Sequence, residues 1–172
     1  MIFKNGPDSL NKPSLKGKQN LILRPFIAAD AIRMLALVSD ALCGDLSIEP
    51  IHTLAQAQAF VMGKGSSHRD RYAVLHPLYG LIGGVAWGKQ TANVAFISYW
   101  IFPPYQGQGL GKQALSLLLN HITKQGIPDI IADVYYDNLV SKKLLKHFGF
   151  VWSGRQLDDL PGKAIDRYEL RL

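Results

Sequence analysis

Residues 105–112, YQGQGLGK, place three glycines at alternate positions, Gly107, Gly109 and Gly111. The run before them, FISYWIFPP, is rich in β-formers and ends in two prolines, which lack an N–H group and cannot extend a sheet ladder. The run after them repeats apolar residues at helical spacing. The sequence therefore predicts a strand that stops, a turn without side chains, and a helix.

A helix that begins near Gly107 leaves its first backbone N–H groups without partners, and its dipole adds partial positive charge there. Glycine lets a phosphate approach those groups, whereas a tight turn with positive φ would need only one glycine. The spacing is not a P-loop, because Gln113 follows Gly111 and Lys112, and it lacks the third glycine of a dinucleotide fingerprint. The pattern that fits is Gln-x-x-Gly-x-Gly, which begins at Gln106.

The rest of the chain alternates between β-rich and helical patterns. Strands are expected over residues 21–25, 72–76, 81–87, 94–102 and 130–136, with a closing hairpin after them. Helices are expected over 31–39, from Thr53 to near Gly63, from the glycine turn to Gly126, and over 138–148.

Several residues set the ends and faces of these helices. Ala29 and Asp30 offer an N-cap for the first helix, and Thr53 and Gln56 have capping-box spacing. The buried side of the last helix is formed by Val140, Leu144 and Phe148. The segment DALCGDLSIEPI, with Gly44 and Pro50, is expected to be irregular. This order predicts an α+β fold with a mixed central sheet, as one domain over 21–172 after a polar arm of residues 1–20.

Composition narrows the class of protein. The chain has 172 residues, of which 48% are hydrophobic, so it can bury a core. The single cysteine, Cys43, forms no internal disulfide, and no signal peptide or run of about 20 apolar residues is present, so we expect a cytoplasmic protein without a membrane span. The net charge of +6 suits a phosphorylated ligand, whereas nucleic acid is disfavoured because the signature of an RNA-binding sheet is absent. The histidines and the cysteine have no ligand spacing, so no metal is expected.

Two motifs in order make the sequence resemble the GCN5-related N-acetyltransferases. The first is the Gln-x-x-Gly-x-Gly loop after a strand, and the second is NLVSKKLLKHFGF, similar to that family's N-x-x-S-x7-G-F segment through Asn138, Ser141, Gly149 and Phe150. SYWIFPPYQGQGLG and LILRPFIAADA resemble the branch that includes the RimJ/RimL N-terminal acetyltransferases. The resemblance covers about residues 21–172.

The resemblance implies a mostly antiparallel sheet of about seven strands with helices on both faces, and strands 94–102 and 130–136 splayed apart. Acetyl-CoA would be the cosubstrate, with its pantetheine arm against the backbone of Trp100, Ile101 and Phe102 and its pyrophosphate at the N–H groups of 106–112. The remaining cofactor-binding residues implied are Gln106, Gly107, Gln108, Gly109, Leu110, Gly111, Lys112, Asn138 and Ser141. Phe96, Tyr99, Trp100 and Phe102 are expected in the core and the pocket wall.

The second motif also carries the expected acid. Ser141 could donate a proton to the leaving thiolate, although Asn138 could equally be a helix N-cap and Ser141 a first-turn residue. Leu145 stands where many relatives have a tyrosine acid, so Tyr135, Tyr136 or water remain alternatives. Lys142, Lys143 and Lys146 either form a solvated face or help to neutralise the adenosine phosphate.

The base that takes the amine proton has no motif. Candidates are Glu49, Asp45, His52 and His76, of which we favour Glu49 and His52 because residues 31–64 usually form the acceptor wall in this family. For each of them, a surface charge or a packed imidazole is the ordinary interpretation.

These observations predict an acetyl-CoA-dependent N-acetyltransferase that works by direct attack in a ternary complex, since Cys43 has no partner for an acetyl-enzyme. The acceptor is a protein N-terminus or a small amine, and the protein is a monomer or a homodimer. The alternative is a catalytically silent acyl-CoA-binding sensor or assembly module.

Overall fold

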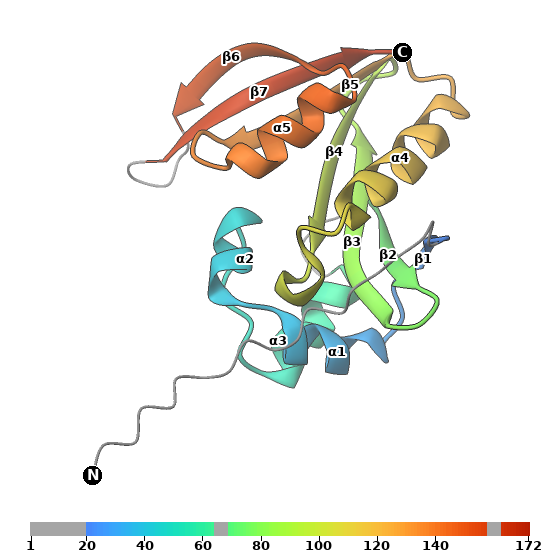
Figure 1. The fold of residues 1–172 in the computed structure, drawn as a ribbon, viewed down its shortest axis with the longest axis vertical. Coiled ribbons are helices and arrows are strands. Elements are labelled where there is room, and N and C mark those ends of the chain that lie inside the picture. The colour runs from blue at the N-terminus through green and yellow to red at the C-terminus, as the bar shows by residue number, and fades with distance from the viewer. Residues whose placement is uncertain (1–19, 64–68, 158–162) are drawn as a thin grey trace.

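The computed structural model describes residues 20–63, 69–157 and 163–172, so the predicted arm of residues 1–20 lies outside the described residues except for its last position. Seven strands form one sheet in the order β1-β2-β3-β4-β5-β7-β6 (Figure 1). Every neighbouring pair is antiparallel except β4 and β5, which are parallel. The strands are β1 (Ile22–Pro25), β2 (Asp70–His76), β3 (Gly80–Lys89), β4 (Val94–Ile101), β5 (Asp129–Tyr135), β6 (Val151–Leu157) and β7 (Ala164–Arg171). The predicted mixed sheet is confirmed.

Helices cover both faces of the sheet. They are α1 (Asp30–Leu37), α2 (Asp40–Asp45), α3 (Leu54–Val61), the 3₁₀ turn η1 (Pro103–Tyr105), α4 (Leu110–Thr123) and α5 (Leu139–His147). His121 of α4 contacts the rings of Tyr72 and Trp87 on one face, while Phe60 of α3 contacts Trp100, which points to the other. Figure 1 shows α4 and α5 on one side of the sheet and α1 to α3 clustered at its lower end.

The helix starts follow their capping residues. Thr53 and Gln56 form the predicted capping box of α3. The expected N-cap of α1 is wrong in detail, because Ala29 makes no side-chain bond and Asp30 is the first helical residue. The Asp30 carboxylate instead accepts from the Ile27 N–H at 2.9 Å and from Arg24 at 2.7 Å, which fixes the entry into the helix.

The segment expected to be irregular contains α2. The Ser39 hydroxyl caps this helix by accepting from the Leu42 N–H, and Leu42 and Cys43 are buried in the core. Tertiary burial therefore outweighs the low helix propensity of Gly44. The chain leaves the helix through Ser47, whose φ is 53°.

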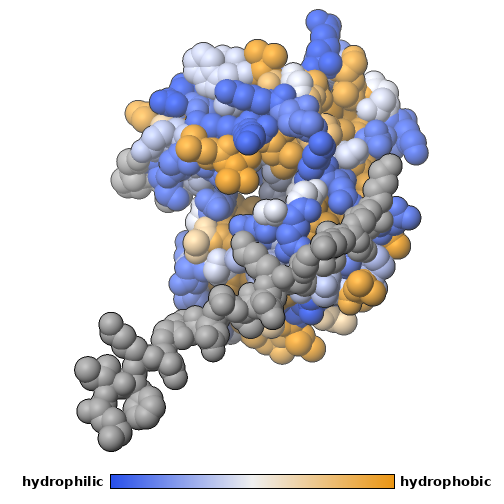
Figure 2. Space-filling view, viewed as in Figure 1, coloured by the Kyte–Doolittle hydropathy of each residue, from blue (hydrophilic) through white to orange (hydrophobic). Residues whose placement is uncertain are grey.

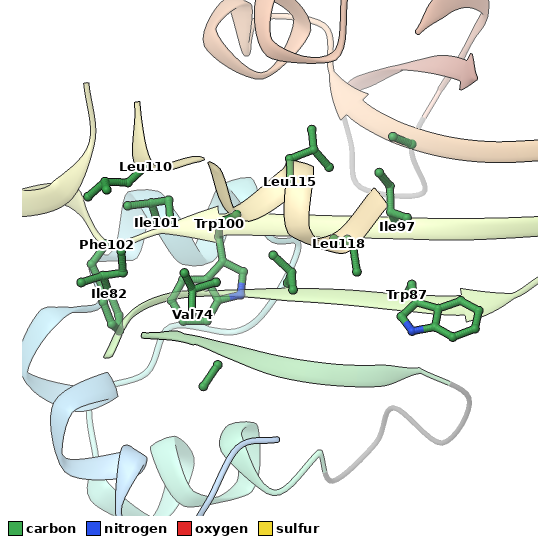
Figure 3. Close-up of a cluster of buried hydrophobic side chains, with 14 of the residues drawn as sticks. Val74, Ile82, Trp87, Ile97, Trp100, Ile101, Phe102, Leu110, Leu115 and Leu118 are labelled. Carbon is green, nitrogen blue, oxygen red and sulfur yellow. The ribbon is translucent and has the colours of Figure 1, made fainter. Parts of the chain in front are cut away.

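The main core lies between α4 and the centre of the sheet. Leu110, Leu115 and Leu118 of α4 are at most 1% exposed and pack over β3 and β4 (Figure 3). In the same figure Trp100 extends from β4 toward β3, and its ring lies 5.0 Å from that of Phe102. The apolar spacing that predicted α4 included Leu110 and Leu118, which are buried, and Leu117, which is half-buried, but not Leu115.

The last helix is rotated from its predicted orientation. Val140 is 82% exposed, whereas Leu145 is fully buried, and Leu144 and Phe148 are half-buried. The prediction of Val140 as a core residue is therefore wrong. Val140 lies in the first turn of α5, where it lines the cavity described below.

Within residues 20–63, 69–157 and 163–172, no helix has the length and apolar character needed to span a bilayer. The same residues contain no group of three or more metal-ligating side chains placed to hold an ion.

Candidate functional site

The two parallel strands β4 and β5 separate soon after they begin. Their pairing covers only Val94 to Phe96 against Asp129 to Ile131. Beyond that point a cavity of about 900 Å³ opens, lined by both strands and by residues of α2, α3, α4 and α5. In the space-filling view the surface is indented between the part that holds α5 and the part that holds α1 to α3 (Figure 2). The strand separation thus builds a site inside the sheet.

The glycine turn lies at the mouth of this cavity. Gly107 and Gly109 have φ values of 74° and 77°, and a Cβ at either would meet no atom within 4 Å among the described residues. Gly109 is the N-cap of α4 and offers no side chain, so the N–H groups at the start of the helix stay uncapped. Lys112, in the first turn, is exposed and also lines the cavity. The geometry is that of an anion site at a helix N-terminus.

The other predicted residues of the loop are structural in part. Gln106 donates from Nε2 to the Ile101 carbonyl at 2.8 Å, and Gln108 donates to the Pro104 carbonyl at 3.2 Å. Leu110 is buried in the core, and neither it nor Gln108 lines the cavity. The side chains of Gln106 and Gln108 thus stabilise the turn. Because the side chain of Leu110 is buried in the core, any contact of Leu110 with a ligand would come from its main chain.

The open edge of β4 presents backbone donors to the cavity. The Phe102 N–H donates to the Ile82 carbonyl of β3 at 2.9 Å, so it points away from the gap. N–H groups alternate in direction along a strand, and those of Tyr99 and Ile101 therefore face the side that β5 has left. Of the three residues expected to hold a ligand with their backbone, Trp100 and Phe102 direct their N–H groups toward β3, whereas Ile101 directs its N–H into the gap.

Asn138 and Ser141 are held together at the start of α5. The Asn138 side chain accepts from the Ser141 N–H at 3.0 Å, so Asn138 is the helix N-cap, one of the two interpretations left open. The Ser141 hydroxyl lies 2.6 Å from the hydroxyl of Tyr99 on β4. Burial raises the pKa of Tyr99 to about 12, against the lowering effect of its bond to Ser141. Tyr99 therefore keeps its proton at neutral pH and can donate it to Ser141.

Tyr99 was expected only as a core or pocket-wall residue, and its contact with Ser141 was missed. Of the alternatives for an acid, Tyr135 also lines the cavity, where its hydroxyl bonds to that of Ser47, whereas Tyr136 is exposed and outside the lining. Leu145 is fully buried, so a titratable group could not reach the cavity from that position without repacking.

Among the four base candidates, the structure brings one into the cavity lining, Asp45 at the end of α2. Desolvation raises the pKa of Asp45, and the carboxylate of Asp137 raises it further, while Lys163 opposes both. Glu49 is exposed and lies outside the lining, and the same holds for His52, which bonds to Asp40 at 2.7 Å.

His76 lies under the glycine turn rather than in the cavity. It is buried, and its Nδ1 accepts from the N–H groups of Leu78 and Tyr79 at 3.1 and 3.3 Å. Its ring stacks on Tyr79, which contacts Tyr105 of η1. Burial lowers the pKa of His76, and the neutral ring supports the turn that precedes the glycines.

Lys142 is not part of a solvated face or a phosphate site. It bonds to Asp166 of β7 at 2.5 Å and to the Tyr136 carbonyl, and its side chain is mostly buried. Arg155 completes the cluster at 2.6 Å, and its hydrogen bond, with that of Lys142, holds the pKa of Asp166 far below its usual range. This cluster ties α5 to β7, while Lys143 and Lys146 remain exposed as predicted.

The wall opposite Ser141 combines aromatic rings with arginines. Phe26 stacks on Trp100 with ring centroids 6.3 Å apart, and Phe60 meets Trp100 edge-on at 6.1 Å. Arg69 and Arg71, at the start of β2, line the same cavity. Sequence analysis did not identify either arginine, although two arginines at alternate positions of a strand place both side chains on one face.

The comparisons agree with this geometry. The profile of the acetyltransferase (GNAT) domain family matches residues 20–151. No curated protein sequence matches the chain.

Three solved structures represent the structural matches. The acetyltransferase (GNAT family) from Bacillus anthracis has a TM-score of 0.77 at 19% identity, covering 91% of this chain and 96% of that one. Spermidine N-acetyltransferase from Vibrio cholerae, in complex with CoA and spermine, has 0.75 at 19%, covering 88% and 95%. The ribosomal-protein α-N-acetyltransferase RimL in complex with coenzyme A has 0.74 at 19%, covering 88% and 94%.

Proposed function

Because the chain belongs to the GNAT acetyltransferase family, we propose that it transfers the acetyl group of acetyl-CoA to a primary amine in the cavity between β4 and β5. Enzymes of this family use acetyl-CoA. The observation that carries the proposal is the juxtaposition of an open strand edge with an uncapped helix N-terminus at one cavity. An extended arm can add to the edge as a strand, and a diphosphate can bind the helix N-terminus.

The residues of the turn fit a diphosphate. The bare positions Gly107 and Gly109 leave the backbone open to a ligand, and Lys112 adds a positive charge. The side chain of Asn138 still has its NH₂ group to donate, because the cap uses only its oxygen. These contacts would hold the cosubstrate, which supplies an activated acetyl thioester.

In the reaction a C–N bond forms and the thioester C–S bond breaks, so one proton leaves the amine and one is added to the thiolate. The Ile101 N–H faces the gap and is the donor we assign to the carbonyl oxygen as it gains charge. Ser141 is the proposed acid. Either hydroxyl of the 2.6 Å pair can be the donor, and in the proposed reaction Tyr99 donates, so that the proton of Ser141 points into the cavity.

We assign the base to Asp45, acting directly or through water, in place of the expected Glu49. Asp45 lines the cavity, and its raised pKa makes it a better proton acceptor than an ordinary aspartate. Glu49 stays a prediction from the sequence: both residues are exposed, but Glu49 lies outside the cavity lining.

The class of amine that accepts the acetyl group is proposed from similar proteins and from the pKa values of amines. The printed names of similar proteins give spermidine in one case and a ribosomal-protein N-terminus in another, so both are candidates for this chain. An α-amino group has a pKa near 8 and is partly neutral at physiological pH, whereas an alkylamine near about 10.4 needs more help from a base.

The test is thiol release from acetyl-CoA across a panel of peptides with free N-termini, amino acids, amino sugars and polyamines. We expect acetyl-CoA to raise the melting temperature and at least one amine to release CoA well above the water background. A melting shift without release by any amine would favour the acyl-CoA sensor, and an unchanged melting curve at saturating acetyl-CoA would contradict both.

A further inference from the structure

Two arginines line the cavity on the side of Phe26 and Phe60: Arg71 in β2, and Arg69 immediately before that strand. Arg71 pairs with Ala86 of β3, and Ala86 pairs with Ser98 of β4, so the three side chains share one face of the sheet. This is the face of Phe96 and Trp100, opposite to the face of Tyr99 and α5. The backbone of Arg71 lies two strand spacings, about 10 Å, from the backbone of the open strand β4. The long arginine side chain can span part of this distance.

Arg71 is held in place by aromatic rings. Its guanidinium carbon lies 4.4 Å from the ring centre of Phe60 and 5.7 Å from that of Phe26, and it donates to the Phe60 carbonyl. Burial, followed by the positive charge of Arg69, lowers the pKa of Arg71, yet an arginine stays charged in proteins. The chain therefore keeps a fixed cation in a partly desolvated wall.

No carboxylate neutralises this charge within the part of the chain that the structure describes. The ion pairs of that part do not involve Arg69 or Arg71. Asp133 lines the cavity too, but both of its oxygens accept from Arg167 at 2.8 Å. Arg69 lies 4.5 Å over the ring of Phe96, a contact to the ring face that does not itself occupy the N–H donors at the edge of the guanidinium. A desolvated charge without a partner is costly, and a ligand anion would offset that cost.

We propose that the acceptor is a small primary amine that also carries an anionic group, a carboxylate or a phosphate, which Arg69 and Arg71 bind. This inference depends on the proposed acetyl transfer. Arginine guanidinium groups bind both carboxylates and phosphates with paired hydrogen bonds. Asp45, on α2, provides the negative group that attracts the ammonium end before it loses its proton. A polyamine would meet two cations of its own sign.

The experiment compares matched amines that differ in the anion: alanine against alaninamide, and phosphoethanolamine against ethanolamine, with spermidine as the polycation. The readout is kcat/KM from thiol release. We expect the anionic member to be preferred by tenfold or more in at least one pair, and the pair that shows it distinguishes carboxylate from phosphate. A preference for the neutral members or for spermidine would overturn the inference while leaving acetyl transfer established.

Variants test the assignment to the arginines. Arg71→Gln and Arg69→Gln should reduce the ratio of anionic to neutral kcat/KM about tenfold or more, the loss expected for a hydrogen bond to a charged group, with little change for the neutral amine. Arg171→Gln is the control, because Arg171 is exposed and outside the cavity. Arg69 is also exposed, so its variant remains informative if Arg71→Gln folds poorly. The assignment would be wrong if Arg69→Gln folds and keeps the wild-type ratio, provided that Arg71→Gln either keeps the ratio as well or does not fold. These arginines would then only support the aromatic wall.

Discussion

The two walls of the cavity recognise ligands by different means. The wall at the turn 106–112 and along β4 offers main-chain N–H groups, with glycine at Gly107 and Gly109 to expose them. The wall formed by β2, α3 and the chain before α1 offers side chains, the rings of Phe26 and Phe60 and the guanidinium of Arg71. A ligand common to a whole family can be held by backbone, whereas a ligand that differs between members must be read by side chains. The predictions that follow test this division.

The largest effect is expected at the glycine turn. Gly109→Val should weaken acetyl-CoA binding about 100-fold, because a charged diphosphate would lose one or two backbone hydrogen bonds. Titration calorimetry and the melting shift measure this loss. Gly126→Val is the matched control: φ is 70°, and a Cβ there also meets nothing within 4 Å, so both variants carry similar backbone strain but only one is at the cavity. Equal loss of binding in both would mean that strain, and not the exposed backbone, explains the effect.

The second-largest effect is expected at the hydroxyl pair of Ser141 and Tyr99. Ser141→Ala should lower kcat by roughly 10- to 100-fold, at or below the lower end of general acid catalysis, with unchanged affinity for acetyl-CoA. Tyr99→Phe should have a smaller effect, and the double variant should be no worse than Ser141→Ala, because the two hydroxyls act as one unit. Single-turnover rates with an active amine measure this, and Ser153→Ala on exposed β6 is the control. A matching loss of acetyl-CoA affinity would show that Ser141 helps to hold the cosubstrate, as proposed for Asn138 and Lys112, and is not only an acid.

A smaller effect is expected at Gly84 of β3, which lies against Trp100 in the wall that also contains Phe26 and Phe60. A Cβ at Gly84 would lie 2.6 Å from the Trp100 ring, so Gly84→Ala must displace that ring. We expect a loss of about 1 to 3 kcal/mol in the free energy of unfolding from overpacking, and a roughly tenfold rise in KM for the acceptor. Affinity for acetyl-CoA should change little. Gly154→Ala, in β6 with open space around its Cβ, should leave both quantities as in the wild type.

The smallest effect concerns pH and the support under the glycine turn. Because burial lowers the pKa of His76 in the folded protein, the unfolded chain takes up a proton first as pH falls below about 6.5. The stabilising contribution of the neutral ring is therefore complete above that pH and is lost on going down to the folded-state pKa. His76→Asn keeps an acceptor for the two N–H groups but does not titrate, so it should flatten this part of the curve. Urea unfolding between about pH 5 and 7.5 measures it; a variant curve parallel to that of the wild type would exclude His76 as the source.

Much of the fold could be predicted because its signals are local. Prolines after a β-rich run ended β4, glycines opened α4, and Thr53 with Gln56 started α3. α2 was missed because burial of Leu42 and Cys43, a tertiary effect, stabilises it despite Gly44. The orientation of α5 was wrong at Val140 for the same kind of reason, since the helical period does not say which apolar residue of the helix lines a cavity instead of the core.

The candidate site likewise has parts that the sequence could predict and parts that it could not. The turn 106–112 and the Asn138–Ser141 pair have fixed spacing along the chain, so a motif could reveal them. The contact of Tyr99 with Ser141 joins residues 42 positions apart, and Arg71 and Phe60 meet across a change of element. No local pattern encodes such contacts. For that reason Glu49 was favoured over Asp45 from the sequence, although of the two only Asp45 lines the cavity.

The short ladder between β4 and β5 has a consequence for how the protein behaves among other proteins. An unpaired strand edge is normally a hazard, because a strand of another chain can add to it and start aggregation. Here the unpaired stretch of β4 beyond Phe96 faces inward, across the gap to β5, with α2 and α5 at its margins. The molecule thus keeps this unpaired edge in its interior, where a slender extended ligand can complete it, whereas the outer edges of the sheet lie at β1 and β6.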